Sequence, residues 1–466
     1  MDIDASIFRS YDIRGAVGRT LTSDAVRSIG RSFGTEALRR GHRKCVLGGD
    51  VRRSTPSLRT KLTEGVRSTG LDVVDIGVVT TPIMYFAAES LGEGAGLMIT
   101  GSHNPPQDNG IKMVLEHRAL MADEIQSLRL RIRNEDYALG RGQFSTQDMS
   151  DRYIERVSTE IEICRPLKVV GDFGNGCAGI HTPIVLERLG CELIPLYARP
   201  DGRFPNHHPD PARPENVSAL RSAVLTTRAD VGIAFDGDGD RLGVLDERGR
   251  QIWPDRLLML LAEAVLRDSP QKTPVVLDVK WSSNLRRVIE SLGGTPVMCR
   301  TGHTWTKARM RETEAPLGGE FSGHICFADR WNGTDDATYA ACRLLELVAS
   351  SEHPASALFD RFPNWQSEPE LLLEVSESDK FRIVDELVHR SSKLEGCVTA
   401  IDGVRIDQAD SWALVRASNT AAHLSLRFEG RTSDDLARIR SRMLQELVEI
   451  YPALRAQFRL RSMSNS

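Results

Sequence analysis

The stretch Cys45-Val46-Leu47-Gly48-Gly49-Asp50 is a short apolar run that ends in two glycines and an acidic residue. An apolar run bounded by turn residues is typical of a buried strand. On either side lie segments with the apolar spacing of an amphipathic helix, residues 24–40 before the run and residues 55–70 after it. We expect Ser23 to cap the first helix and Pro56 to lie in the first turn of the second.

Two further apolar runs, at residues 71–76 and 96–100, complete a β-α-β-α-β order, which predicts a mainly parallel sheet covered by helices. The same order begins again at Lys168-Val169-Val170 and at Pro274-Val275-Val276-Leu277. From about residue 368 the pattern changes to that of a small α+β domain, which ends in a helix over Ser433–Ile450. The sequence therefore predicts three similar α/β domains followed by a smaller α+β domain.

Length and composition limit the class of protein. A chain of 466 residues exceeds one hydrophobic core. The net charge of -4 argues against a dedicated nucleic-acid binder. The longest apolar run, residues 257–266, is too short to span a bilayer, and the first ten residues lack the apolar segment of a secretory signal. Eight scattered cysteines without a C-x-x-C pair favour reduced thiols, so we predict a cytoplasmic protein without nucleic-acid or membrane partners.

A polar loop, Thr100-Gly101-Ser102-His103-Asn104-Pro105-Pro106, follows the strand predicted to end near Ile99. In an open α/β sheet, ligands bind beyond the carboxyl ends of the strands. Ser102 between a glycine and a rigid Pro-Pro turn is therefore a candidate nucleophile or phosphate carrier. Taken alone, the loop is equally well explained as an ordinary turn capped by its serine. A serine hydrolase is disfavoured because Ser102 does not lie in a G-x-S-x-G motif and His103 is too close in sequence to serve easily as its base.

Three carboxylates alternate with glycines in Asp236-Gly237-Asp238-Gly239-Asp240, which follows the strand predicted over Val231–Phe235. Because adjacent carboxylates repel one another, a hard divalent cation is their natural partner. An EF-hand loop is the rival interpretation, and Glu247 falls at its twelfth position. However, Arg241 occupies the sixth position, where that loop needs glycine. A solvated acidic loop without metal is the remaining alternative.

A G-x-G-x-x-G pattern, Gly174-Asn175-Gly176-Cys177-Ala178-Gly179, follows the strand predicted from Lys168. The pattern alone is a weak indication of a dinucleotide site. No acidic residue clearly ends the next predicted strand, where a ribose ligand is expected. We therefore interpret the glycines as a tight strand-to-helix turn and predict no nicotinamide cofactor.

Two more polar loops carry candidate ligand-binding groups. Gly319-Glu320-Phe321-Ser322-Gly323-His324 offers a carboxylate, a hydroxyl and an imidazole, which suit sugar hydroxyls and proton transfer. Arg416-Ala417-Ser418-Asn419-Thr420 offers the guanidinium, hydroxyl and amide donors of a phosphate cradle. If the second loop stood alone, we would interpret it as a strand-to-helix turn.

Together these motifs resemble the α-D-phosphohexomutase superfamily, of the phosphomannomutase/phosphoglucomutase type. The resemblance spans the chain in order: Phe8-Arg9-Ser10-Tyr11-Asp12-Ile13-Arg14-Gly15, the Ser102 loop, the aspartate triplet, the Glu320 loop and the Arg416 loop. It implies three three-layer α/β/α domains with mainly parallel mixed sheets and a smaller α+β domain, all around a central cleft. We place these domains at residues 1–152, 153–255, 256–367 and 368–466.

The resemblance also implies roles for individual residues. Ser102 carries the phosphoryl group, with Arg14 and Lys112 beside it. Asp236, Asp238, Asp240 and the Ser102 phosphate bind one Mg²⁺. The sugar is read by Glu320, Phe321, Ser322, Gly323 and His324, with methionine as the usual family residue in place of Phe321. The non-reacting phosphate is held by Arg416, Ser418, Asn419 and Thr420, and further substrate contacts come from Tyr11, Lys280 and His303.

The implied reaction interconverts hexose 1-phosphate and hexose 6-phosphate, of mannose or glucose, through a hexose 1,6-bisphosphate that is both intermediate and activator. Either Lys112 or His324 removes the proton from the attacking hydroxyl. The alternatives are a phosphoglucosamine mutase, a non-catalytic sugar-phosphate binding protein and a metal-stabilised structural protein. We expect hexose phosphates as partners, and a monomer or weak homo-oligomer.

Overall fold

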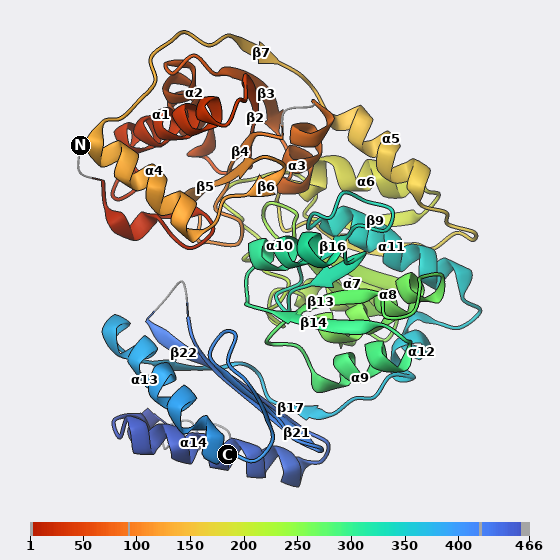
Figure 1. Cartoon of the computed structure of the whole chain (residues 1–466). Coiled ribbons are helices and arrows are strands. Elements are labelled where there is room, and N and C mark those ends of the chain that lie inside the picture. Colours follow the sequence, from red (N-terminus) through yellow and green to blue (C-terminus); the bar gives the residue numbers. More distant parts are fainter. Residues whose placement is uncertain (1–2, 92–93, 419–421, 458–466) are drawn as a thin grey trace.

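The computed structural model describes residues 3–91, 94–418 and 422–457. Four units follow one another along the chain (Figure 1). Three are α/β units, each with its own sheet, and the last is a smaller unit in which two helices lie on one face of an antiparallel sheet. We call them domains I to IV. The predicted fold class is confirmed.

Domain I contains a mixed sheet of order β1-β5-β4-β2-β3-β7, with β6 paired to β5. Strands β4, β2, β3 and β7 are parallel, whereas β5 is antiparallel to both β4 and β1. The α1 helix is capped by the side chain of Thr22, which accepts from the Ala25 amide, so the predicted Ser23 cap was wrong by one residue. The elements are β1 (Ile13–Ala16), α1 (Ser23–Arg39), β2 (Lys44–Gly49), α2 (Thr55–Arg67), β3 (Asp72–Val78), α3 (Thr81–Ser90), β4 (Gly96–Ile99), β5 (Asp108–Leu115), β6 (Arg118–Ala119), α4 (Ala122–Asn134) and β7 (Phe144–Thr146).

Domain II has the sheet order β12-β11-β10-β8-β9, in which β10, β8 and β9 are parallel. The hairpin of β10 and β11 holds the aspartate triplet at its turn. Its elements are α5 (Ser150–Glu160), β8 (Lys168–Asp172), α6 (Ala178–Arg188), β9 (Glu192–Leu196), α7 (Ser218–Thr227), β10 (Val231–Phe235), β11 (Leu242–Asp246) and β12 (Gln251–Ile252). The proline-rich segment 199–214 contains no helix or strand.

Domain III has the sheet order β14-β13-β15-β16, with β16 antiparallel to β15. The loop between β15 and β16 is the Glu320 loop. The elements are α8 (Pro254–Arg267), β13 (Pro274–Asp278), α9 (Ser283–Ser291), β14 (Thr295–Cys299), α10 (His303–Thr313), β15 (Leu317–Gly319), β16 (Ile325–Phe327), α11 (Ala337–Ser350) and α12 (Ala355–Asp360).

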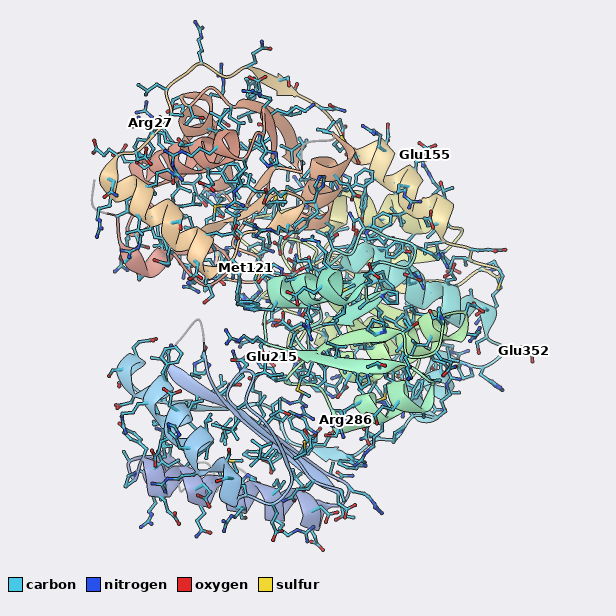
Figure 2. The ribbon with its side chains drawn as sticks, in the orientation of Figure 1. Arg27, Met121, Glu155, Glu215, Arg286 and Glu352 are labelled. Carbon is cyan, nitrogen blue, oxygen red and sulfur yellow. The ribbon has the colours of Figure 1, made fainter. Side chains whose placement is uncertain are left out.

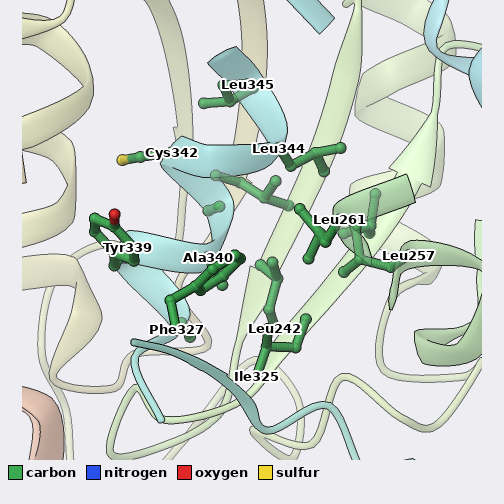
Figure 3. Close-up of a cluster of buried hydrophobic side chains, with 14 of the residues drawn as sticks. Leu242, Leu257, Leu261, Ile325, Phe327, Tyr339, Ala340, Cys342, Leu344 and Leu345 are labelled. Carbon is green, nitrogen blue, oxygen red and sulfur yellow. The ribbon is translucent and has the colours of Figure 1, made fainter. Parts of the chain in front are cut away.

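The largest hydrophobic core crosses the boundaries between domains. Figure 3 shows Leu242 of β11 packed with Leu257 and Leu261 of α8 and with Ile325 of β16. The same buried cluster continues through α5 to Ile83 and Met84 of α3 in domain I. Burying apolar surface is the dominant favourable term in folding, so this shared core holds the loops of domains I, II and III in fixed relative positions.

Domain IV has a separate core and an antiparallel sheet of order β17-β22-β21-β20-β19, with β18 paired to β22. The segment after Arg416 connects two antiparallel strands, so the alternative of a strand-to-helix turn was wrong. Domain IV meets domain III along α9, where Figure 2 labels Arg286 and where Arg287 donates to the Ala409 carbonyl at 2.7 Å. The elements are β17 (Gln366–Ser367), β18 (Leu371–Glu374), α13 (Glu377–Arg390), β19 (Cys397–Thr399), β20 (Val404–Asp407), β21 (Ser411–Ala417), β22 (His423–Gly430) and α14 (Ser433–Ile450).

Candidate active site

A cavity of about 180 Å³ lies where domains I, II and III meet. It is polar, and the predicted residues Tyr11, Arg14, Ser102, Lys112, His303, Glu320 and His324 all line it, together with Arg9, His103, Asn104 and Arg241. These side chains come from distant segments of the sequence. The resemblance implied a central cleft, and these side chains of three domains line one cavity.

Ser102 lies in the loop after β4, at the carboxyl end of a parallel strand. Its backbone adopts a left-handed conformation, with φ of 48°, and its amide donates to Thr100 Oγ1 at 2.8 Å. The Ser102 hydroxyl donates to Asp236 Oδ2 at 2.8 Å and lies 3.1 Å from His103 Nδ1. The serine of domain I and the first aspartate of domain II are therefore in direct contact.

The aspartate triplet forms the turn between β10 and β11, and all three carboxylates are fully buried. Asp236 Oδ1 accepts from the amides of Asp240 and Arg241, which folds the segment back on itself. Thr81, at the start of α3, donates to Asp238 through both its amide and its hydroxyl. The Glu247 carboxylate accepts a hydrogen bond from the Ser356 amide of domain III at 2.9 Å. Glu247 therefore does not complete an EF-hand loop.

The triplet fits a divalent cation. Oxygen atoms from the three carboxylates lie within 4.8 Å of one another. Asp238 Oδ1 and Asp240 Oδ1 are buried and have no hydrogen-bond partner, and a buried unpaired carboxylate oxygen is costly unless a cation or donor faces it. A set made only of oxygen ligands suits Mg²⁺.

Lys112 of β5 supplies positive charge beside the triplet. Its ammonium group lies 2.8 Å from Asp238 Oδ2 and also donates to Asp240. Burial opposes the charge on Lys112, but Asp238 and Asp240 outweigh it and hold its pKa well above the usual 10.5. Burial also opposes the charge on Asp238 and by itself would raise the pKa of this carboxyl. The nearby Lys112 outweighs burial, so the pKa of Asp238 is lowered. The pKa of Asp236 is raised by burial and by its two aspartate neighbours.

Arg14 of β1 reaches the serine loop from the other side. Its Nε donates to Asp12 Oδ2 at 2.6 Å, and its Nη1 donates to Asn104 Oδ1 at 2.8 Å. Burial opposes the guanidinium charge, but Asp12 outweighs this and raises the pKa of Arg14. A fixed, charged fork beside Ser102 is suited to a phosphate group.

Two histidines of domain III face the cavity around one buried aspartate. His303 Nδ1 and His324 Nδ1 each lie 3.0 Å from Asp335 Oδ2, and the two rings stack with centroids 4.9 Å apart. Arg241 Nε donates to His324 Nε2 at 3.1 Å, so this nitrogen carries a lone pair and Nδ1 carries the proton. Burial, followed by Lys307, lowers the pKa of His303 to about 4, so this ring is neutral at pH 7.

The Glu320 loop is a tight turn between β15 and β16. The Glu320 amide donates to the His324 carbonyl, and Gly323 closes the turn with φ of 99°. Burial opposes the charge on Glu320, but His324 and Arg241 lower its pKa. Phe321 packs under the guanidinium of Arg427 from domain IV, with 3.6 Å from Cζ to the ring centroid. Ser322 lies in the same turn.

The predicted phosphate cradle belongs to domain IV, and its described residues Arg416 and Ser418 are not among those that line the cavity. Arg416 Nε donates to Asp402 Oδ2 at 3.0 Å, and the same oxygen accepts from the Thr301 amide of domain III at 3.1 Å. Ser418 is buried and its amide donates to the His423 carbonyl. Lys280 donates to Glu370 at 2.7 Å. Asn419 and Thr420 lie outside the described residues.

The G-x-G-x-x-G segment has a packing role. A Cβ on Gly179 would lie 2.1 Å from the Ala198 carbonyl oxygen, and a Cβ on Gly176 would lie 2.8 Å from that of Gly237. The segment leads from β8 into α6, as the interpretation of a tight strand-to-helix turn requires.

Sequence reasoning missed three residues that organise the site: Arg241, Asp335 and Asp402. Arg241 directly follows the triplet, and this adjacency was the available signal. The sequence around Asp335 and Asp402 carries no comparable signal, because each residue lies in a loop and its partners are distant in the sequence.

The fold and the cavity define a class: a four-domain α/β protein in which a buried serine meets a carboxylate triplet. The chain belongs to the phosphoglucomutase/phosphomannomutase family. It matches alpha/beta/alpha domain I of that family over residues 5–138, domain II over 151–249, domain III over 253–365 and the C-terminal domain over 370–446.

Individual relatives agree with this assignment. The chain is 45% identical to a phosphomannomutase/phosphoglucomutase of Pseudomonas aeruginosa, covering 98% of each chain. It is 40% identical to a phosphoglucomutase of Neisseria gonorrhoeae, covering 97% of this chain and 98% of the relative. A crystal structure of a phosphoglucomutase/phosphomannomutase family protein from Burkholderia thailandensis superposes with a TM-score of 0.92 at 44% identity, covering 97% of this chain and 99% of that one.

Proposed function

We propose that this protein is a phosphohexomutase, an isomerase that interconverts the 1-phosphates and 6-phosphates of mannose, glucose or both. Family membership supports the reaction class, and the names of the relatives support these two sugars. The single observation that carries the chemistry is the 2.8 Å contact between Asp236 and the hydroxyl of Ser102, a residue that lines the cavity together with several cationic groups.

Ser102 is the proposed phosphoryl carrier. Asp236, Asp238 and Asp240, with the Ser102 phosphate, would hold one Mg²⁺, which supplies charge neutralisation at the serine oxygen when bound. Arg14 faces the serine loop and is placed to bind the oxygens of the transferring group. Lys112 balances the charge of the triplet. Phosphoryl transfer depends mainly on such positioning and charge stabilisation.

The first transfer runs from Ser102 to the sugar. A hydroxyl oxygen of the hexose 1-phosphate forms a bond to phosphorus, the bond from phosphorus to the Ser102 oxygen breaks, and the hydroxyl loses its proton. Of the two candidate bases, we assign this proton to His324 Nε2, whose lone pair accepts from Arg241 in this structure and takes the proton once Arg241 releases it. Lys112, in contrast, donates to Asp238 and Asp240. Asp335, close to His324 Nδ1, orients the ring.

The second transfer needs the sugar in the opposite orientation. The hexose 1,6-bisphosphate turns over in the cleft. The Ser102 oxygen then forms a bond to phosphorus of its 1-phosphoryl group, the bond from that phosphorus to the sugar O1 breaks, and O1 takes back a proton, which leaves hexose 6-phosphate. Glu320, with Ser322 in the same turn, is suited to bond hydroxyl pairs of the sugar in either orientation. Tyr11 and His303 also line the cavity, and Lys280, Arg416 and Ser418 are assigned to the distal phosphate once domain IV closes.

The replacement Ser102→Ala tests the proposal. It removes the only oxygen of that side chain, so turnover of glucose 1-phosphate and mannose 1-phosphate should fall to background in a coupled assay. Ser127→Ala is the matched control, because Ser127 is exposed on α4 and its hydroxyl donates only to the Asp123 carbonyl among the described contacts. Mutase activity near the wild-type level in the Ser102 variant, with an unchanged melting temperature, would contradict the proposed carrier. The ratio of kcat/KM for the two sugars identifies the preferred epimer.

We place the protein in the cytoplasm, with hexose phosphates as its small-molecule partners. All eight cysteines are free thiols, which suits a reducing compartment. Among the described helices, none combines the length and apolar character needed to cross a membrane.

A further inference from the structure

Arg52 is a buried arginine directly behind the Ser102 loop. Its side chain is fully buried, and all five of its N–H groups have acceptors. Nη2 donates to the carbonyls of Ser102 and Asn104 at 2.7 and 2.6 Å, and Nη1 donates to those of Pro105 and Asp108 at 2.6 and 3.0 Å. The fifth N–H, on Nε, is paired with Asp50 at 3.1 Å. One side chain therefore fixes four carbonyl oxygens of the loop that presents Ser102.

Asp50 joins this network to the strand beneath it. Its Oδ2 accepts from both Arg52 Nε and the Gly101 amide, and its Oδ1 accepts from the Arg52 amide and the Thr55 hydroxyl. A Cβ on Gly101 would lie 2.5 Å from the Arg52 guanidinium carbon, so glycine is required for this close approach. The backbone on both sides of Ser102 is held by the Arg52–Asp50 pair.

The conformation held in this way is an unfavourable one for serine. A left-handed backbone is rare for residues other than glycine, asparagine and aspartate, and it persists only when surrounding contacts impose it. Here it directs the Ser102 hydroxyl to Asp236. The carbonyl of Ser102, on the opposite side, bonds to Arg52.

The proline-rich segment 199–214 of domain II, which has no part in the proposed chemistry, covers Arg52. The Phe204 ring lies 5.1 Å from the guanidinium carbon. A Cβ on Gly202 would lie 2.5 Å from the Arg52 Cα atom, so the two backbones are in close contact. The cover keeps water from the guanidinium, and hydrogen bonds are stronger where water is excluded.

We propose that Arg52, paired with Asp50 and covered by segment 199–214, is a positioning residue that holds Ser102 in its transfer geometry. Arg52 is not among the residues that line the cavity, so it acts through the serine loop and not on the sugar. The proposal rests on the proposed phosphoserine function and extends it: the geometry of transfer depends on a contact between domains I and II.

The replacement Arg52→Lys tests this role. Lysine keeps the charge but has one nitrogen, which cannot reach four carbonyl oxygens. A misplacement of about 1 Å at a reacting group costs on the order of a hundredfold in rate. We expect kcat to fall by roughly this factor while KM for hexose 1-phosphate changes by less than about twofold, because sugar contacts remain. The rate at which glucose 1,6-bisphosphate phosphorylates Ser102, followed by intact-protein mass, should fall in parallel.

Arg343→Lys is the matched control. Arg343 is also buried, pairs with Asp329 and packs over Phe327, and among the described contacts it touches no residue of the Ser102 loop. Both variants should lose thermal stability, but only Arg52→Lys should lose kcat. Asp50→Asn is a second, isosteric variant. Its NH₂ group faces either Arg52 Nε and the Gly101 amide or the Arg52 backbone amide, so a donor opposes a donor in both orientations, and kcat should fall as in Arg52→Lys.

The inference is overturned if the folded Arg52→Lys variant has wild-type kcat, or, should that variant not fold, if folded Asp50→Asn has wild-type kcat. This outcome differs from a failure of the proposed function. In that case Ser102→Ala itself would retain turnover, whatever the Arg52 variants do.

Discussion

At the scale of single residues, the site is a problem of charge balance. Asp236, Asp238 and Asp240 are buried together, and within the described residues Lys112 is the cation in contact with two of them. Two of their oxygen atoms, Asp238 Oδ1 and Asp240 Oδ1, have no hydrogen-bond partner among the described residues. A bound cation removes this cost, so metal binding and the burial of the triplet depend on each other.

Asp238→Asn should therefore weaken Mg²⁺ binding. It removes one negative charge and one hard ligand, so the Mg²⁺ concentration that restores half of the activity after chelation should rise at least about tenfold. Asp246→Asn is the control, since Asp246 is equally buried in the same hairpin but bonds the Arg248 and Arg250 amides. The same Mg²⁺ response in Asp238→Asn and wild type would exclude this carboxylate as a ligand.

The proton assignment is also a single-residue claim. His324→Asn removes the lone pair that Arg241 now occupies, and loss of a general base typically costs 10²–10⁴-fold in rate. We expect kcat to fall within that range, measured in the coupled assay at saturating substrate. His117→Asn, at an exposed position, should have no effect. A His324 variant with undiminished kcat would assign the proton to another group.

At the scale of helices and strands, local pattern predicted the elements but not their neighbours. The strand Val231–Phe235 and the helix Ser433–Ile450 were predicted with their observed bounds, because an apolar run between turn residues and a 3.6-residue period are local signals. The Thr22 cap, the antiparallel β5 and the hairpin after Arg416 were not predicted. Pairing partners are set by distant segments. The same limit hid Asp335, because its two histidines come from the start of α10 and from the Glu320 loop.

A buried histidine at the contact between α5 and α6 makes the stability of the fold depend on pH. His181 on α6 lies 2.9 Å from the Ser150 hydroxyl on α5, and burial lowers its pKa to about 4. A histidine in the unfolded chain has a pKa near 6.5. Between pH 4 and pH 6.5, His181 therefore binds a proton in the unfolded state but not in the folded state. The free energy of unfolding contributed by His181 is therefore complete above pH 6.5 and falls as the pH drops toward 4.

His181→Gln should remove this dependence while keeping a bond to Ser150. We expect the free energy of unfolding of the wild type, relative to the variant, to fall by up to about 3 kcal/mol between pH 7 and pH 4. Urea denaturation at several pH values measures this difference. A difference that stays constant with pH would show that His181 does not titrate in this way.

At the scale of the whole molecule, three domains act as one body and the fourth is attached to it. The shared core joins domains I, II and III. Domain IV has its own core and meets domain III through a small apolar cluster, in which Trp412 and Leu414 pack with Val279, and through polar contacts such as Asp402 with Thr301. Asp402 also holds Arg416, so the proposed phosphate cradle and the contact between domains use the same carboxylate. Movement of domain IV is the expected way to bring the cradle to the cavity.

Arg416→Ala should mainly weaken substrate binding. Each charge-assisted hydrogen bond contributes about 1.5–3 kcal/mol, so KM for hexose 1-phosphate should rise by roughly 10- to 100-fold with a smaller change in kcat. Arg431→Ala is the control, because Arg431 lies in the same domain in an exposed ion pair with Asp410. An unchanged KM in the Arg416 variant would remove the cradle from the account.

The most direct test of the central claim is the intact mass of the purified protein after incubation with glucose 1,6-bisphosphate, followed by peptide mapping. We predict the addition of one phosphate, located on Ser102 and lost when hexose 1-phosphate is added. A protein that turns over hexose phosphates but carries no phosphate, or carries it on another residue, would contradict the account.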